Sequence, residues 1–261
     1  MKPIITNPIR KSVLSNGVKL LIPVIFILFW QALMAGDGQN VQILPSPAKV
    51  FLAIINLFGE GTIITDILVS LKHVFIGFFI ASMAGIIAGV AFGYSKIVKT
   101  LFMPLTEFIR PIPPIAWIPI SILWFGIGDN PAYFLVSLGA FFPIMTNAYF
   151  GVISVEENYK RAALSLGAGR KEILLDIILP ASWPSIFTGL KTGLGISWFM
   201  VIVAELVGSQ SGLGYMIQLN RLLLHTDKVV AGMIIIGICG YLMNKAMEIL
   251  ERKLLPWRLI A

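Results

Sequence analysis

Residues 74–93 read VFIGFFIASMAGIIAGVAFG and contain no Asp, Glu, Lys or Arg. A helix needs roughly 20 apolar residues to cross about 30 Å of hydrocarbon, so this stretch is long enough to span a membrane. Within it Gly77, Ala81, Gly85 and Gly89 recur every four residues, and such a face of small side chains lets a second helix approach closely. The stretch predicts a tightly packed transmembrane helix, which we place over residues 68–94.

Similar uncharged blocks recur along the rest of the chain, which is 57% hydrophobic and only 13% charged. A soluble domain of 261 residues needs more charge to cover its surface. The blocks predict an all-α integral membrane protein, and the sequence contains no internal repeat or linker, so we expect one domain over residues 1–261. The six expected transmembrane helices cover residues 18–34, 68–94, 103–126, 132–152, 184–208 and 229–250.

The net charge of +7 follows the expected topology and does not indicate a nucleic-acid partner. With the N-terminus placed in the cytoplasm, 14 of the 20 Lys and Arg residues fall in cytoplasmic segments. This is the positive-inside bias of membrane proteins, and it predicts that both termini are cytoplasmic.

The third expected span is unusually rich in proline. Proline removes a backbone donor and its ring clashes with the preceding turn, so a straight helix is not expected here. Broken backbone at membrane depth is tolerated where protein or a water-filled cavity satisfies it. We therefore place the segment beside a translocation path, with a kinked packing helix as the alternative. The prolines are Pro104, Pro111, Pro113, Pro114 and Pro119.

Elsewhere the sequence gives few signs of chemistry. Residues 48–58 predict a short helix on the outer membrane surface, ended by Gly59 and Gly61. Cys239 stands alone in the last span, and His73 and His225 are interpreted as interfacial side chains near the outer face. The glycine-rich phosphate loop of nucleotide-binding proteins is absent from the sequence, so we expect no ATP hydrolysis and no cofactor in this chain.

One hydrophilic segment separates the fourth and fifth spans, and its residues 159–180 read YKRAALSLGAGRKEILLDIILP. The pattern predicts a helix, a glycine stop and a second helix that ends at Pro180. Ala162, Ala163 and Leu166 offer a small apolar surface on the first helix, which suits docking into the groove of a partner. The cytoplasmic segment covers about residues 156–176, and its basic residues are Lys160, Arg161, Arg170 and Lys171.

This segment resembles the signature of ABC importer permeases. The signature places Glu-Ala-Ala, Gly, Ile and Leu-Pro at fixed spacing, and the sequence matches it with Arg161 in place of the usual Glu. The matching residues are Ala162, Ala163, Gly167, Ile177, Leu179 and Pro180.

Further stretches are similar to the nitrate/sulfonate/taurine/bicarbonate branch of these permeases. They are residues 110–119, 124–129 and 193–198, and the resemblance extends from about residue 44 to residue 257. The loop at residues 211–215 is most similar to taurine and alkanesulfonate members.

The resemblance implies a type I importer permease in the bacterial inner membrane, embedded in the lipid bilayer. It implies a second copy of the permease, two cytoplasmic ATPase subunits that bind ATP and Mg, and an external substrate-binding protein. By the same resemblance the cytoplasmic segment contacts the ATPase through Arg161, Ala162, Ala163, Gly167, Ala168, Gly169, Arg170 and Lys171. The expected substrate is taurine or an alkanesulfonate, with nitrate or bicarbonate as alternatives.

A secondary transporter without an ATPase and a membrane enzyme are the competing classes. The sequence has no acidic relay within its spans and no cluster of His, Asp, Glu or Cys at one face, which argues against both.

Candidate residues of a translocation path are Arg110, Pro113, Trp117, Trp198 and Glu205. Charges inside a membrane are costly and often functional, and Arg110 and Lys191 would suit a small oxyanion. The alternatives are that Arg110 pairs with Glu107, that Lys191 reaches the interface, that Glu205 pairs with Arg221, and that both tryptophans pack or anchor helices.

Overall fold

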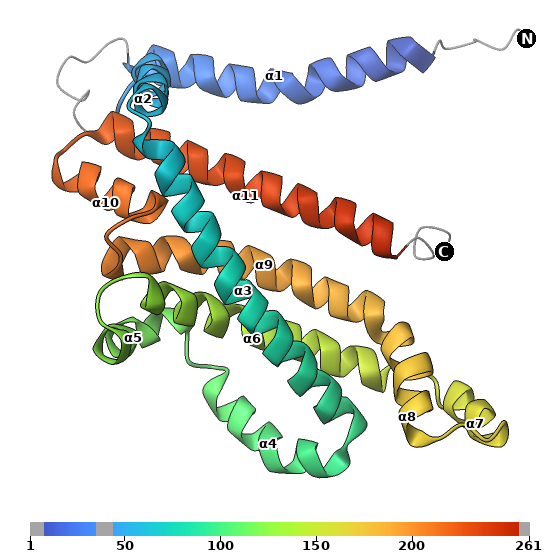
Figure 1. Cartoon of the computed structure of the whole chain (residues 1–261). Helices are drawn as coiled ribbons and strands as arrows, with labels where there is room; N and C mark the ends of the chain where they lie inside the picture. The colour runs from blue at the N-terminus through green and yellow to red at the C-terminus, as the bar shows by residue number, and fades with distance from the viewer. Residues whose placement is uncertain (1–7, 35–43, 256–261) are drawn as a thin grey trace, which may run out of the picture.

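The computed structural model describes residues 8–34 and 44–255, with side chains from Leu21 onward. Every regular element in these residues is helical, which confirms the expected all-α fold (Figure 1). The elements, in chain order, are α1 (Pro8–Met34), α2 (Pro47–Gly59), α3 (Thr62–Tyr94), α4 (Lys96–Ile109), η2 (Pro114–Trp117), α5 (Ile118–Phe125), α6 (Asp129–Ile153), α7 (Glu157–Ser165), α8 (Arg170–Glu172), η3 (Ile173–Ile178), α9 (Leu179–Gly208), α10 (Leu213–Leu222) and α11 (Thr226–Leu254).

Four helical runs within the described residues are long and apolar enough to cross a membrane. They are α3, α6, the continuous run Arg170–Gly208 and α11. The bent pair α4 and η2–α5 makes a fifth if the two parts are counted together as one broken span. The first expected span, residues 18–34, coincides with α1, whose described side chains cover only Leu21–Met34.

Helix α6 forms the centre of the bundle, with α3 on one side and α9 on the other (Figure 1). The small-residue face of α3 makes this packing possible. A Cβ atom added at Gly77 would lie 2.6 Å from the Cβ of Val136, and one at Gly85 would lie 3.0 Å from Cγ2 of Ile144. Real Cβ atoms do not approach that closely, so the predicted role of this face is confirmed.

The third span is broken, as its prolines predict. Helix α4 and the pair η2–α5 meet at an angle of 84°, and the break falls at residues 110–113. Pro104 lies inside α4, and Pro119 lies in the first turn of α5. A first-turn proline is tolerated because its missing N–H would have no helical partner there.

The second cytoplasmic helix does not end at Pro180, contrary to the sequence prediction. Helices α8, η3 and α9 form one run of 39 residues from Arg170 to Gly208. In η3 the chain takes π-helical turns, and the N–H of Leu179 donates to the carbonyl of Leu174, five residues back. We attribute the continuity to this wider turn, because proline clashes with the carbonyl four residues earlier in an α-helix.

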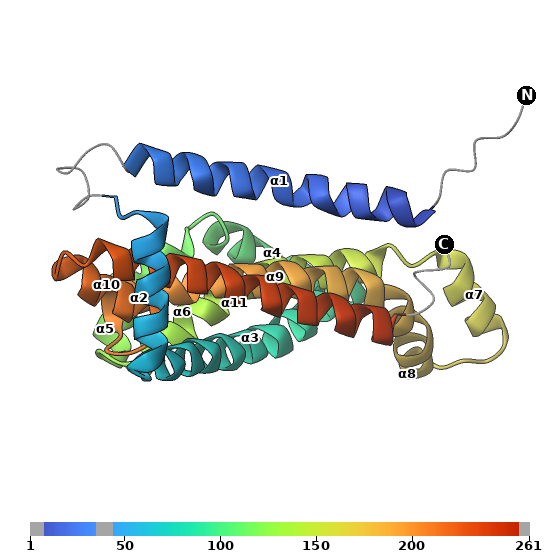
Figure 2. The same ribbon diagram turned by 90° about the horizontal axis from the view of Figure 1, so that it is seen from above.

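The predicted short helix at residues 48–58 is confirmed as α2, which ends at Gly59. Its Val50, Ala53 and Leu57 are buried against a cluster that includes Leu213 of α10 and Ala231 of α11. Helices α2, α5 and α10 gather at one end of the bundle. Helices α7 and α8 lie at the opposite end, together with the start of α1 and the end of α11 (Figure 2).

Candidate functional sites

Helix α7 projects from the end of the bundle beyond α6 and the α8–η3–α9 run (Figures 1 and 2). It is the first helix predicted in the cytoplasmic segment. Its last turn closes with two backbone hydrogen bonds, from Ala168 N–H to the Ala163 carbonyl at 3.0 Å and from Gly167 N–H to the Leu164 carbonyl at 3.0 Å. Gly167 has φ +88°, the left-handed conformation that glycine adopts without a steric penalty. This is a Schellman stop, so the signature glycine has a definite backbone role.

The underside of α7 is anchored to the bundle. Ala163 and Ala168 are half-buried and pack on a cluster formed by Val152, Val155 and Ile173. The Tyr94 hydroxyl at the end of α3 donates to the Arg170 carbonyl at 3.1 Å. Ala163 therefore faces the bundle and does not belong to the exposed apolar surface predicted from the sequence.

The exposed side of α7 carries apolar and basic residues together. Leu166 is 89% exposed, and Tyr159 and Leu164 are also exposed. Arg161 lies within 4.0 Å of Glu157, one turn earlier on the same helix. Ala162, Gly169, Arg170 and Lys171 are exposed beside this surface. The N–H of Gly169 donates to Glu172 at 2.7 Å, which caps the start of α8.

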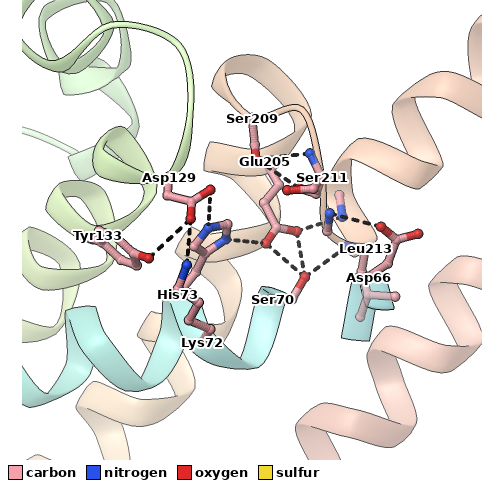
Figure 3. A network of polar contacts seen from close by, with 12 residues as sticks. Asp66, Ser70, Lys72, His73, Asp129, Tyr133, Glu205, Ser209, Ser211 and Leu213 are labelled. Atoms are coloured by element: carbon pink, nitrogen blue, oxygen red, sulfur yellow. Dashed lines mark hydrogen bonds and ion pairs between the residues drawn. The ribbon is translucent and has the colours of Figure 1, made fainter. Parts of the chain in front are cut away.

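A buried polar network lies at the other end of the bundle and centres on Glu205 of α9 (Figure 3). The carboxylate of Glu205 is 1% exposed and accepts hydrogen bonds from the Ser70 hydroxyl at 2.8 Å and the Gly214 N–H at 2.9 Å. Nδ1 of His73 lies 2.8 Å from the same carboxylate. Glu205 is thus held by α3 and α10, and no ion pair with Arg221 is formed in the described structure.

His73 connects this carboxylate to the start of α6. Its side chain is fully buried, and its second ring nitrogen, Nε2, lies 3.2 Å from Oδ1 of Asp129. Lys72 completes the chain of charges through a 2.8 Å contact with Asp129 (Figure 3). The interpretation of His73 as an interfacial side chain is therefore wrong: burial between two carboxylates gives its imidazole polar partners inside the protein.

The network also caps the N-terminus of α10. The first N–H groups of a helix have no partner within the helix, and they attract negative charge. Here the N–H of Gly212 donates to Asp66 at 3.1 Å, that of Leu213 to the Ser70 hydroxyl at 2.9 Å, and that of Gly214 to Glu205. Three side chains from α3 and α9 thereby fix where the α9–α10 loop ends.

The other sequence-predicted residues lie apart from this network. Trp198 is half-buried and donates from Nε1 to the Ile236 carbonyl of α11 at 3.1 Å. Trp117 packs edge-on against Phe134. Lys191 pairs with Glu251 of α11 at 2.9 Å.

Arg110 and Pro113 both lie at the break between α4 and η2. Arg110 is exposed and has no ion pair with Glu107 or another described residue. Sequence reasoning did not single out Asp66, Ser70 or Lys72.

Residues 81–256 match the family described as "Binding-protein-dependent transport system inner membrane component". The chain belongs to this family. The resemblance to ABC importer permeases is confirmed, and the permease is accordingly a multi-pass membrane component of an importer.

Two curated relatives match the permease over nearly its whole length. A putative ABC transporter permease protein of Methanocaldococcus jannaschii is 40% identical over 246 residues, which are 92% of each chain. The taurine transport system permease protein TauC of Escherichia coli (strain K12) is 36% identical over 251 residues, or 94% of this chain and 91% of TauC.

Among solved structures, a chain of the MetNI methionine ABC transporter in an inward-facing conformation is similar in fold. The TM-score is 0.62 at 20% identity, over 71% of the permease and 93% of the MetNI chain. The likeness confirms the expected type I importer fold.

Proposed function

We propose that the permease works as a pair of identical subunits that import a small organic sulfonate, taurine or an alkanesulfonate, with energy supplied by two cytoplasmic ATPase subunits. An external binding protein would deliver the substrate at the end formed by α2, α5 and α10. The termini would then lie in the cytoplasm of a bacterial cell, on the side of α7, in line with the charge bias of the sequence.

The observation that carries the proposal is the construction of α7. Its exposed surface, with Leu166 at the tip, suits a groove in a soluble partner, while Ala163 and Ala168 anchor its underside. After the stop at Gly167 the chain enters the continuous helical run Arg170–Gly208, which contains Glu205. A partner that moves α7 would therefore move the outer end of α9, where the buried network holds α3 and α10.

The substrate class is supported by two observations. The permease is 36% identical to TauC, which is named as a taurine transport permease. The break in the third span also bears a cation, Arg110, without a described ion-pair partner. A guanidinium group binds oxyanions well because its donors match their geometry. In this mechanism ATP binding by the partners turns the pair outward, and hydrolysis returns it inward.

The test is a pull-down of the tagged permease from detergent-solubilised membranes, followed by an ATPase assay of the co-purified proteins. We expect an ATPase subunit to be retained by the wild-type permease, and its retention to fall by about tenfold in Leu166→Glu, since a charge would be buried at the docking surface. Leu222→Glu is the control, because Leu222 is an exposed leucine of α10 at the opposite end.

A permease that purifies alone and moves solute into liposomes without ATP would contradict the proposal and favour a secondary transporter. If the ATPase is retained and the complex takes up nitrate but not taurine, the proposal of an ATP-driven importer stands and the proposed substrate changes to nitrate. The two parts of the proposal are therefore tested separately.

A further inference from the structure

A small pocket lies between α4 and α6, next to the break in the third span. Its volume is about 80 Å³, whereas a single water needs only about 10–15 Å³. Thr106, Glu107 and Arg110 of α4 and Thr146 and Tyr149 of α6 are its polar lining residues. The rest of the lining is apolar and consists of Phe92, Met103, Met145 and Phe150. The pocket thus has room for a molecule of a few heavy atoms, at a place where a discontinuous helix can expose polar groups.

The pocket holds two opposite charges that do not neutralise each other. Glu107 and Arg110 are three residues apart and both line the cavity, yet no ion pair within 4.0 Å joins them in the structure. Neither forms an ion pair with another described residue. Both side chains are exposed. The carboxylate and the guanidinium group are therefore each available to a ligand.

Further donors stand opposite α4. The Tyr149 hydroxyl accepts a hydrogen bond from Nζ of Lys99 at 2.6 Å, so its own hydrogen is free to donate. The Lys99 ammonium lies 5.0 Å from the centre of the Tyr149 ring, which adds a second positive charge near the pocket. The Thr106 hydroxyl, in contrast, already donates to the Met103 carbonyl at 2.8 Å. The pocket therefore offers one guanidinium group and a hydroxyl donor together with one carboxylate, and the Lys99 ammonium lies beside Tyr149.

We propose that this pocket binds a small zwitterion that carries an oxyanion and an ammonium group, as an aminosulfonate such as taurine does. The sulfonate would contact Arg110 and the Tyr149 hydroxyl, and the ammonium would contact Glu107. The assignment rests on the proposed import of organic sulfonates, and it narrows the substrate class to sulfonates that also carry an ammonium group. A simple anion gains from Arg110 but is repelled by Glu107, whereas a zwitterion gains from both.

The test uses a single cysteine as a reporter of occupancy. Because Cys239 is the only cysteine, Cys239→Ala gives a cysteine-free background. Thr106→Cys then places a thiol in the pocket without removing a proposed ligand donor. The matched control is Thr100→Cys on the same helix, whose hydroxyl also bonds a backbone carbonyl but which does not line the pocket. The rate of modification by N-ethylmaleimide is measured on the full-length permease in nanodiscs of zwitterionic lipid.

Taurine is compared with ethanesulfonate, which lacks only the ammonium group, and with ethylamine and nitrate. We expect taurine to slow modification of the cysteine introduced by Thr106→Cys. The concentration of taurine that halves the rate should be about two- to fivefold lower than that of ethanesulfonate, because one solvent-accessible ion pair contributes a binding free energy of about that size. Glu107→Gln should make the two sulfonates equal, and Arg110→Gln should abolish protection by both. The reporter at position 100 should be unaffected by every ligand, which shows that protection is specific to the pocket, and an unchanged melting temperature shows that the variants are folded.

Protection by ethanesulfonate equal to that by taurine in the wild-type pocket, or no protection by either, would overturn the proposal. Slowed modification on addition of anionic lipid alone, with no further effect of taurine, would assign the pocket to a lipid headgroup. The assay needs no ATPase and no turnover. A failed pull-down would therefore count against the proposed importer, while a failed protection experiment would count against the pocket.

Discussion

His73 and Glu205 are 132 residues apart in the sequence, yet Nδ1 of one lies 2.8 Å from Oε1 of the other, and both side chains are fully buried. Removal of one member leaves the other polar group buried without its partner. We expect His73→Ala to lower the free energy of unfolding by about 3–5 kcal/mol, the range for breaking a buried pair. Thermal unfolding of the detergent-solubilised permease measures the loss.

The double variant His73→Ala/Glu205→Gln closes a mutant cycle on this pair. A coupling energy of about 0.5–3 kcal/mol is expected for residues in one network. Lys72→Ala is the control, because the Lys72–Asp129 contact is partly exposed and contributes about 1 kcal/mol or less. Equal losses in His73→Ala and Lys72→Ala would contradict the importance given to the buried pair.

Gly167 and Gly169 offer a matched comparison in the cytoplasmic segment. Gly167 has φ +88°, and nothing lies within 4 Å of a Cβ added there, so Gly167→Val would suffer from backbone strain alone, about 1–2 kcal/mol. Gly169 has φ −75°, and its added Cβ would make only an ordinary 3.7 Å contact with Glu172. Gly167→Val and Gly167→Ala should both reduce ATPase retention in the pull-down, and the matched Gly169→Ala should not. Asparagine at position 167 should be tolerated better than valine, because it adopts the left-handed conformation more readily.

Close packing of α3 on α6 predicts the effect of a larger residue at Gly77. Gly77→Val would force its Cβ against Val136 and should lower stability by about 1–3 kcal/mol through overpacking. Gly195→Ala in α9 should be nearly neutral, since nothing lies within 4 Å of its added Cβ. Val136→Gly removes the contacting Cβ, so a Gly77→Ala/Val136→Gly double variant that loses less stability than the sum of the two single variants would attribute the loss to this contact, and an additive loss would refute it. The melting temperature is the measurement.

Trp198 gives a fourth prediction, which separates packing from a role in transport. Trp198→Phe keeps a ring between α9 and α11 but removes the hydrogen bond to the Ile236 carbonyl. The loss should be about 0.5–1.5 kcal/mol of stability. Substrate uptake per folded molecule should stay unchanged in reconstituted complexes. A fall in uptake without a loss of stability would instead place the indole in contact with the substrate.

Sequence patterns correctly predicted the features of the fold that depend on residues close together in the sequence. Uncharged blocks predicted the spans because hydrocarbon thickness fixes their length. Consecutive prolines predicted the broken third span, and the glycine at position 167 predicted the end of α7. Continuity through Pro180 was missed, because π-helical turns have no clear signature in composition.

The buried network was missed because it joins α3, α6, α9 and α10, which only the tertiary fold brings together. One signal was nevertheless present. Asp66, Ser70 and His73 follow the i, i+4, i+7 spacing of one helix face at the start of the second expected span. A polar stripe of this kind inside a membrane helix indicates partners on a neighbouring helix.

The π-helical turns of η3 also set the direction in which the cytoplasmic segment leaves the bundle. An α-helix rotates by about 100° per residue, so one residue more or fewer in the run turns everything before it about the helix axis by that amount. Deletion of one residue in η3 would preserve every side chain of α7, yet it would aim Leu166 toward a different azimuth. In the proposed importer, the orientation of the ATPase subunit would therefore depend on the number of residues in a helix that the ATPase need not contact.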